Sequence, residues 1–331
     1  MSIRSMQLVI GATGSLGSAI VNELTSSGKS VRALVRNPAK AKRIFKNPEN
    51  VEMVEGSAED VQILTKALDG IEIFHNCLNV PYSQWSRLPE IHGRILEIAA
   101  KTKAKMVFPG NVYIYGHSQT EKVREDHPRN PCSKKGRIRL GLEDTFMRYS
   151  REEKVSCVIM RFPDYYGPNA ASIADGIFQS AVSNKTARWF GKLDAMHEFI
   201  FISDAAKAMI MAEERPNAYS QDFNVPGPEP IRVRDWVSLV FKQAGFEPKM
   251  VGTSRFFVRL AGLFNSNARA FAEMQYLTEE PLILDGTKFT NFFGIKYPSR
   301  SYEDGARETL AWLRNKDSHA AIPENGLKSA V

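Results

Sequence analysis

The stretch from Gly11 to Gly17, near the N-terminus, has the residue types and the spacing of a phosphate-binding turn. The apolar run Met6–Ile10 before it predicts a buried strand, and a helical pattern follows from Ser18. A strand, a tight glycine turn and a helix N-terminus together form an anion site, because the N–H groups of the first helical turn lack intrahelical partners. Three glycines in the pattern GxxGxxG therefore predict that the pyrophosphate of a dinucleotide binds here. The alternative is a glycine-rich turn without a ligand.

The residues after the second expected strand bear on the choice of dinucleotide. The strand Val31–Val35 ends in Arg36, with Arg32 and Lys40 nearby and no carboxylate beside it. In dinucleotide folds an acidic residue at this place binds the ribose 2′-hydroxyl of NAD, whereas an arginine accommodates the additional phosphate of NADP. Arg36 therefore predicts a preference for NADP(H) over NAD(H). The alternative is that Arg36 is an ordinary solvated side chain.

Short apolar strands alternate with amphipathic helices along the first half of the chain. Four further strands are expected at 51–54, 71–75, 105–108 and 155–160. This alternation predicts right-handed βαβ units, and so an α/β fold of the Rossmann type: a doubly wound parallel sheet with a smaller C-terminal substrate lobe. The expected parts are a dinucleotide-binding domain (1–168), a substrate lobe (169–316) with elements that can return to the main sheet, and a mobile tail (317–331).

Composition is typical of a globular protein from a reducing compartment. Of the 331 residues, 43% are hydrophobic and 24% are charged, and the three cysteines form neither a CxxC nor a disulfide framework. The first strand begins close to Met1 and no apolar run could span a bilayer, so we expect no signal peptide, no membrane span and a cytoplasmic location. The six histidines lack metal-ligand spacing, so no metal is expected.

The chain is basic, with a formal net charge of +7 and a pI of about 9.2. Such a balance would suit a nucleic-acid partner. The basic residues are scattered, however, and no Lys/Arg run is interleaved with aromatic residues as in a nucleic-acid platform. An enzyme with a basic surface, an anionic cofactor and a small-molecule substrate is therefore favoured, with no nucleic-acid or membrane partner.

Several motifs follow one another in a fixed order after the glycine turn. They are 73–75 at the end of the fourth strand, 112–116 (VYIYG), Arg161 with 166–168 (YGP), 199–206 (FIFISDAA), and 223–225 (FNV) with 227–230 (GPEP). In this order they resemble the extended short-chain dehydrogenase/reductase family, the NAD(P)-dependent epimerase/dehydratase type. The resemblance implies a homodimer. The cofactor-binding residues that it and the turn imply are Gly11, Thr13, Gly14, Ser15, Leu16, Gly17, Arg36, Ser57, Ala58, Cys77, Leu78, Arg139 and Pro163.

The positions at which this family carries its catalytic Ser, Tyr and Lys hold other residues here. The family serine falls five residues before the glycine of its V-Y-G step, and counting back from Gly116 gives Asn111. The family Tyr and Lys precede a helical glutamate by eight and four residues, and counting back from Glu143 gives Lys135 and Arg139. The chain contains no Y-x-x-x-K. The resemblance therefore implies a non-standard catalytic set of Asn111, Lys135 and Arg139.

These replacements form a consistent set of electrostatic groups. Lys135 and Arg139 are four residues apart, so a helix places both on one face. The ammonium of Lys135 could polarise an oxyanion or exchange a proton if desolvation lowers its pKa. Arg139 could hydrogen-bond the nicotinamide ribose but stays charged, and Asn111 could donate to the same oxyanion. Tyr113 joins the expected catalytic residues as a reserve proton donor, and further reserve donors are Tyr115, Tyr165 and Tyr166. A solvated basic helix face is the alternative.

Three more positions depart from the family pattern. Ser57 stands where the family usually has an aspartate near the adenine, which weakens that contact. Asp164 replaces a substrate-facing asparagine, and His197 replaces an arginine that helps hold nucleotide diphosphates. The resemblance thus implies a more acidic pocket and argues against a nucleotide-sugar substrate.

Two functions from different classes follow from these observations. The first is an NADP(H)-dependent oxidoreductase or epimerase-like enzyme that acts on a small carbonyl or hydroxyl substrate with the non-standard set. The second is a catalytically silent NADP(H)-binding sensor or regulator, similar to the NmrA-like proteins. A nucleic-acid-binding relative ranks third, since only the charge supports it. Fold alone does not decide among them.

Overall fold

The computed structural model describes residues 6–254, 256, 258, 260, 269, 271–280, 282–294 and 300–319. Residues 317–319, which the sequence assigned to a mobile tail, continue the last helix. The rest of that expected tail, 320–331, lies outside the described residues.

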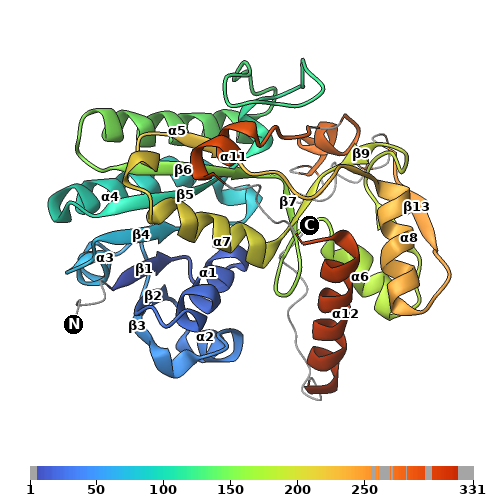
Figure 1. Cartoon of the computed structure of the whole chain (residues 1–331), viewed down its shortest axis with the longest axis horizontal. Helices are drawn as coiled ribbons and strands as arrows, with labels where there is room; N and C mark the ends of the chain where they lie inside the picture. Colours follow the sequence, from blue (N-terminus) through green and yellow to red (C-terminus); the bar gives the residue numbers. More distant parts are fainter. Residues whose placement is uncertain are drawn as a thin grey trace.

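Within these residues, seven parallel strands form the central sheet, in the order β11-β6-β5-β4-β1-β2-β3 (Figure 1). They are β1 (Gln7–Ile10), β2 (Val31–Val35), β3 (Val51–Glu55), β4 (Ile73–Asn76), β5 (Lys105–Asn111), β6 (Cys157–Phe162) and β11 (Asp222–Asn224). The strand order reverses between β1 and β4, so the sheet is doubly wound. The expected α/β Rossmann-type fold is confirmed.

Helices cover both faces of the sheet (Figure 1). One face packs against α1 (Ser15–Ser26), α2 (Pro38–Ile44) and α7 (Ile202–Glu213), and the other against α3 (Val61–Leu68), α4 (Leu88–Thr102) and α5 (Lys134–Arg151). Side chains of a strand alternate between the faces: Val9 belongs to the first core, and Leu8 and Ile10 belong to the second. The strands are apolar on both faces because both faces are covered.

A smaller lobe is built around stacked aromatic rings. Phe199 stacks on Trp236 with ring centroids 4.0 Å apart, and Tyr166 meets Trp236 edge-on. Its helices are α6 (Asp175–Val182), α8 (Val233–Ala244) and α12 (Tyr302–His319). Its strands pair as β7 (Asp164–Tyr166) with β10 (Phe199–Phe201), β8 (Ala187–Trp189) with β13 (Met250–Gly252), and β9 (Met196–His197) with β12 (Ile231–Arg232). Because α7 and β11 lie on the main sheet, the chain passes between the two parts repeatedly.

Further short helical elements lie between the strands and helices named above. They are η1 (Pro48–Asn50), η2 (Tyr82–Arg87), η3 (Val112–Ile114), η4 (Pro216–Ala218), η5 (Gln275–Thr278) and α11 (Thr287–Phe293). Two of them matter for the site, since η2 follows β4 and η3 follows β5 directly. Their side chains therefore start from the carboxyl-end edge of the sheet.

Helix α5 carries polar side chains on its buried face. Ser133 caps its N-terminus, with the hydroxyl accepting the N–H of Gly136 at 2.9 Å. Lys135, Arg139 and Glu143 follow at a spacing of four residues and are all buried, with at most 7% of their surface exposed. The alternative of a solvated basic face is therefore wrong, and these groups must find partners inside the protein.

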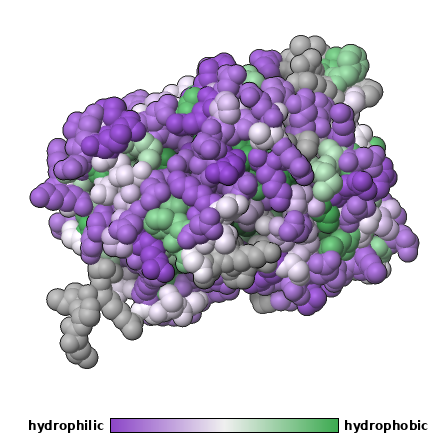
Figure 2. All heavy atoms as spheres, turned by 45° about the horizontal axis from the view of Figure 1, so that its top comes forward, coloured by the Kyte–Doolittle hydropathy of each residue, from purple (hydrophilic) through white to green (hydrophobic). Residues whose placement is uncertain are grey.

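Hydrophilic residues cover most of the face shown in Figure 2. Large apolar side chains that stay exposed on the described chain are Val61, Phe246, Val251, Phe256 and Leu260. No helix among the described residues has the length and apolar character needed to cross a bilayer.

The carboxylate of Glu198 joins three segments that are distant in the sequence. It lies just before β10 with 3% of its surface exposed. Its Oε1 accepts the N–H of Gly227 at 3.1 Å, and its Oε2 accepts the N–H of Leu284 at 3.0 Å. Leu284 also forms a parallel bridge with Val123. Burial raises the pKa of Glu198 to about 7, against the opposing effect of the two N–H donors.

This carboxyl predicts a pH-dependent stability. The unfolded pKa of a glutamate is about 4.3, so the contribution of Glu198 is fully present below that pH and is lost as pH rises through 7. Between pH 5 and 8 the free energy of unfolding of the wild type should fall by roughly 2–3 kcal/mol relative to Glu198→Gln, which cannot ionise. Urea unfolding at a series of pH values measures this, and parallel curves for the two proteins would contradict it.

Candidate functional site

The glycine turn between β1 and α1 has no room for side chains at two of its three glycines. Gly11 has a φ of +76°, and a Cβ there would lie 2.6 Å from the carbonyl oxygen of Cys77. A Cβ on Gly17 would lie 2.2 Å from the carbonyl oxygen of Gly11. Gly14 is the N-cap of α1 and offers no side-chain cap, so the first-turn N–H groups have no competing side-chain acceptor from the cap. The turn therefore fits a phosphate group bound by backbone N–H donors.

The other residues expected at the cofactor follow the carboxyl ends of neighbouring strands. Ser57 and Ala58 follow β3, Cys77 and Leu78 follow β4, and Pro163 follows β6. The N–H of Cys77 donates to the carbonyl of Ile10 at 2.9 Å, which holds the loop after β4 against the glycine turn. In doubly wound sheets a ligand binds at this edge, where the strand order reverses.

The two arginines in and directly after β2 differ in their surroundings. Arg36 is exposed at the end of the strand. Arg32 lies earlier in β2, pairs with Glu52 at 2.8 Å and donates to the carbonyls of Ala67 and Asp69. Arg32 is therefore committed elsewhere, and of these two arginines Arg36 is the exposed one.

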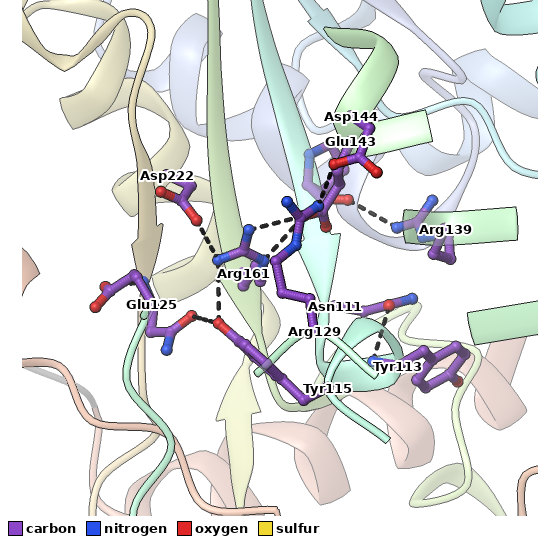
Figure 3. Close-up of polar contacts among 12 residues, drawn as sticks. Asn111, Tyr113, Tyr115, Glu125, Arg129, Arg139, Glu143, Asp144, Arg161 and Asp222 are labelled. Carbon is purple, nitrogen blue, oxygen red and sulfur yellow. Dashed lines mark hydrogen bonds and ion pairs between the residues drawn. The ribbon is translucent and has the colours of Figure 1, made fainter. Parts of the chain in front are cut away.

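Arg139 and Asn111 both lie near the end of β5 (Figure 3). Arg139 donates from Nη2 to the carbonyl of Pro109 at 2.8 Å, and its guanidinium lies 5.0 Å from the centroid of the Phe108 ring. Burial lowers the pKa of Arg139. Its buried Nε has no hydrogen-bond partner among the described residues. Asn111 caps η3, with Oδ1 accepting the N–H of Tyr113 at 3.2 Å.

Lys135 is bound by a carboxylate that the sequence did not reveal. Its Nζ lies 2.5 Å from Oε2 of Glu273, and its backbone N–H donates to Oε1 of Glu273 at 3.1 Å. The side chain of Lys135 is only 7% exposed. Glu273 lies 138 residues further along the chain, and no local sequence pattern predicts a contact over that separation. The ammonium is therefore anchored and charge-compensated.

Tyrosine hydroxyls converge beside these groups. The hydroxyls of Tyr82 in η2 and Tyr113 in η3 are 2.7 Å apart. Burial raises the pKa of both, while Arg139 acts in the opposite direction on each. Of the other reserve donors, Tyr165 is half-buried near Arg139, whereas Tyr115 and Tyr166 are 1% exposed. Tyr82 was not predicted, although its place shortly after β4 is a signal that could have pointed to it.

Two of the departures from the family pattern form a pair. Asp164 at the start of β7 forms a hydrogen bond with His197 in β9, in which Oδ2 and Nε2 are 2.9 Å apart. The ring of His197 is wedged between Trp189 and Phe199, with ring centroids 5.3 and 4.4 Å away. Asp164 also acts electrostatically on Tyr82 and Tyr113. The residue pair therefore belongs to the same polar group as the tyrosines.

A buried arginine ties the site to the sheet (Figure 3). Arg161 in β6 lies 2.7 Å from Glu143 and 2.6 Å from Asp222, and its Nη1 donates to the hydroxyl of Tyr115 at 3.1 Å. Burial alone would lower the pKa of Arg161, but the two carboxylates raise it well above its ordinary value. Arg129 adds a longer contact to Glu143 at 3.9 Å.

No cluster of three or more histidine, cysteine, aspartate or glutamate side chains that could hold a metal ion occurs in the described part of the chain.

Comparison with known proteins places these features in a family. The model of the NAD dependent epimerase/dehydratase family matches residues 7–225. A putative UDP-glucose 4-epimerase of Methanocaldococcus jannaschii is 27% identical over 104 residues, and an uncharacterized UDP-glucose epimerase of Bacillus subtilis is 27% identical over 150 residues. These alignments span 30% and 44% of this chain, and 34% and 47% of the two relatives.

Solved structures share the whole fold at low identity. The UDP-glucose 4-epimerase of Thermotoga maritima, solved with UDP-glucose, has a TM-score of 0.76 and 18% identity, covering 94% of this chain and 99% of that one. The dTDP-glucose 4,6-dehydratase of Bacillus anthracis, in complex with NAD, has a TM-score of 0.78 and 16% identity, covering 95% and 97%. The resemblance expected from the motifs is confirmed: this chain belongs to the NAD dependent epimerase/dehydratase family of enzymes.

Proposed function

We propose that this chain is an NADP(H)-dependent oxidoreductase or isomerase that acts on a carbonyl or hydroxyl group of a small substrate. The observation that carries the proposal is that the glycine turn and a cluster of polar side chains lie at the same edge of the sheet. The glycine turn of α1 lies at the strand-order reversal, and the amide, hydroxyl and guanidinium groups gather at the ends of β4, β5 and β6. A dinucleotide bound across that edge would reach from the turn to the polar groups.

The residues of the chain fit such a cofactor at two points of this site. First-turn N–H groups of α1 would bind the pyrophosphate, in the space that the glycines leave free. The unpartnered Nε of Arg139 is a buried donor that would find an acceptor in the nicotinamide ribose. When bound, the nicotinamide supplies or accepts the hydride, while the protein orients it and excludes competing reactions.

The choice of NADP(H) rests on Arg36. Structures of similar proteins contain NAD, so the family itself does not favour the phosphorylated form. Arg36 is exposed directly after β2, and the carboxylate that would bind a ribose 2′-hydroxyl is absent from that position. An exposed guanidinium at this place supports the 2′-phosphate as its partner.

The pairing of charges supports a substrate without a diphosphate group. Lys135 is bound by Glu273, and His197 is bound by Asp164. A nucleotide diphosphate would need cationic partners, and these side chains already have acidic ones. A small neutral carbonyl or hydroxyl compound meets the tyrosine hydroxyls and the amide of Asn111 without displacing an ion pair. The homodimer and the cytoplasmic location remain predictions from the sequence.

A cofactor-binding sensor without catalysis is the second candidate function. The observation that favours it is the anchored ammonium of Lys135, which the ion pair with Glu273 holds away from proton exchange. Saturable NADPH binding with no turnover of any carbonyl probe would support this candidate.

Substitution of Arg36 tests the cofactor assignment. Arg36→Ala should weaken NADPH binding roughly 10-fold to 100-fold, because a charge-assisted phosphate contact contributes about 1.5–3 kcal/mol. NADH binding should stay unchanged. Titrations followed by nicotinamide fluorescence measure both affinities. Arg151→Ala, which removes an exposed arginine at the end of α5, is the matched control. Equal losses for NADPH and NADH, or no loss, would contradict the assignment.

Substitution of two polar groups tests catalysis. Planar aromatic rings line the site, so phenanthrenequinone serves as the carbonyl probe, with NADPH oxidation followed by absorbance. Asn111→Ala should lower kcat roughly 100-fold to 1000-fold, since it removes an oxyanion donor. Lys135→Met should lower kcat at least about 10-fold by removing a nearby cation. Lys134→Met, the exposed neighbour, is the control. Unchanged kcat in the first two variants would exclude them from the catalytic set.

A further inference from the structure

The hydroxyl pair of Tyr82 and Tyr113 differs from Lys135 and Arg139 in that neither hydroxyl is bound to a charged group or a backbone carbonyl in the described part of the chain. The two oxygens are 2.7 Å apart, and both side chains are half-buried rather than enclosed. Lys135 and Arg139 are 6% and 7% exposed, and each is held by an acceptor of the protein. The tyrosine hydroxyls therefore carry protons and pair with each other rather than with a charged group.

Rigid neighbours hold the pair in place. The ring of Trp85 meets Tyr82 edge-on with centroids 5.0 Å apart and stacks on Tyr113 at 6.0 Å. Its indole N–H donates to the carbonyl of Val80 at 3.0 Å, which fixes the ring. A site that is held this firmly loses little free energy to reorganisation when a substrate oxygen arrives.

The backbone of Tyr113 is fixed as well. Asn111 accepts its N–H, and the first turn of α5 packs against its carbonyl oxygen, which would lie 2.6 Å from a Cβ on Gly136. Glycine at position 136 thus allows the closest approach of α5 to η3. This approach brings the ammonium of Lys135 to 5.3 Å from the centroid of the Tyr82 ring.

We propose that Tyr113 is the proton donor of the site and that Tyr82 returns a proton to it. Tyr113 would thus take the role of the family tyrosine that is absent from the helix. The proposal rests on the proposed function, which supplies the hydride from a reduced nicotinamide. As the substrate carbonyl carbon receives that hydride, the Oη–H bond of Tyr113 breaks and its proton moves to the substrate oxygen. The Oη–H proton of Tyr82 then passes to Tyr113, and Tyr82 regains a proton from water. Oxidation of an alcohol runs the same path in reverse.

The electrostatic setting suits this step. Both tyrosines are protonated at neutral pH, and although burial raises the pKa of each and so weakens it as an acid, Arg139 acts in the opposite direction on both. The charged groups that face the pair are Arg139, Lys135, Asp164 and Glu273. The two cations would stabilise the transient phenolate, since their charge acts over a short distance in a poorly solvated place. Neither cation needs to give up a proton.

The test compares Tyr113→Phe and Tyr82→Phe with Tyr149→Phe, a tyrosine of α5 that packs beside Arg148 and Lys154 away from the pair. With NADPH and phenanthrenequinone, Tyr113→Phe should lower kcat roughly 100-fold to 10000-fold, the range of general acid catalysis. Tyr82→Phe should lower kcat less, and Tyr149→Phe should not change it. NADPH affinity, measured by fluorescence, should stay within about threefold in every variant, because no cofactor contact is removed.

Two readouts separate proton donation from a merely structural role. The solvent deuterium isotope effect on kcat should be reduced or lost in Tyr113→Phe. The same variant should bind the quinone more weakly in its NADP⁺ complex, as measured by quenching of tryptophan fluorescence. Unchanged kcat, or unchanged quinone binding together with an unchanged isotope effect, would overturn the proposal while leaving the proposed function standing. Failure of the wild type to bind NADPH would instead remove the proposed function itself.

Discussion

The buried guanidinium of Arg161 is the interaction on which the geometry of the site depends. A charge that is 1% exposed is costly unless it is paired, and Glu143 from α5 and Asp222 from β11 both pair with it. Gly110 on β5 leaves the necessary space, since a Cβ there would lie 2.6 Å from Cγ of Arg161. One side chain thereby fixes β5, β6, β11 and α5 relative to one another. Lys135 and Arg139, at fixed helical spacing before Glu143, are positioned as a consequence.

Charge compensation is the second common property of the site. Two of the replacements that distinguish this chain from the family pattern are paired within the protein: Lys135 is bound by Glu273, and Asp164 is bound by His197. Besides these two pairs, the polar groups gathered at the site are the amide of Asn111, the hydroxyls of Tyr82 and Tyr113, and the guanidinium of Arg139. Under the proposed function, these groups would supply the oxyanion environment and the proton in place of the family Ser, Tyr and Lys.

Local patterns in the sequence were sufficient for the fold and for one half of the site. The glycine spacing, the apolar strands and the helical interval between Lys135 and Glu143 depend on neighbours in the chain, so the parallel sheet, the glycine turn and the shared helix face of Lys135 and Arg139 could be predicted. Contacts between distant segments could not. Glu273, the pairing of Asp164 with His197, and the approach of Tyr82 to Tyr113 are set by tertiary packing, which no periodicity encodes.

A crystal structure of the protein with NADPH would test the central claim most directly, because the claim is that the turn and the polar groups form one site. The account predicts the pyrophosphate against the first turn of α1 and the nicotinamide ribose within hydrogen-bond distance of Nε of Arg139, the buried donor that has no partner among the described residues. A dinucleotide bound elsewhere, or a nicotinamide ribose turned away from Arg139 and Tyr113, would contradict it.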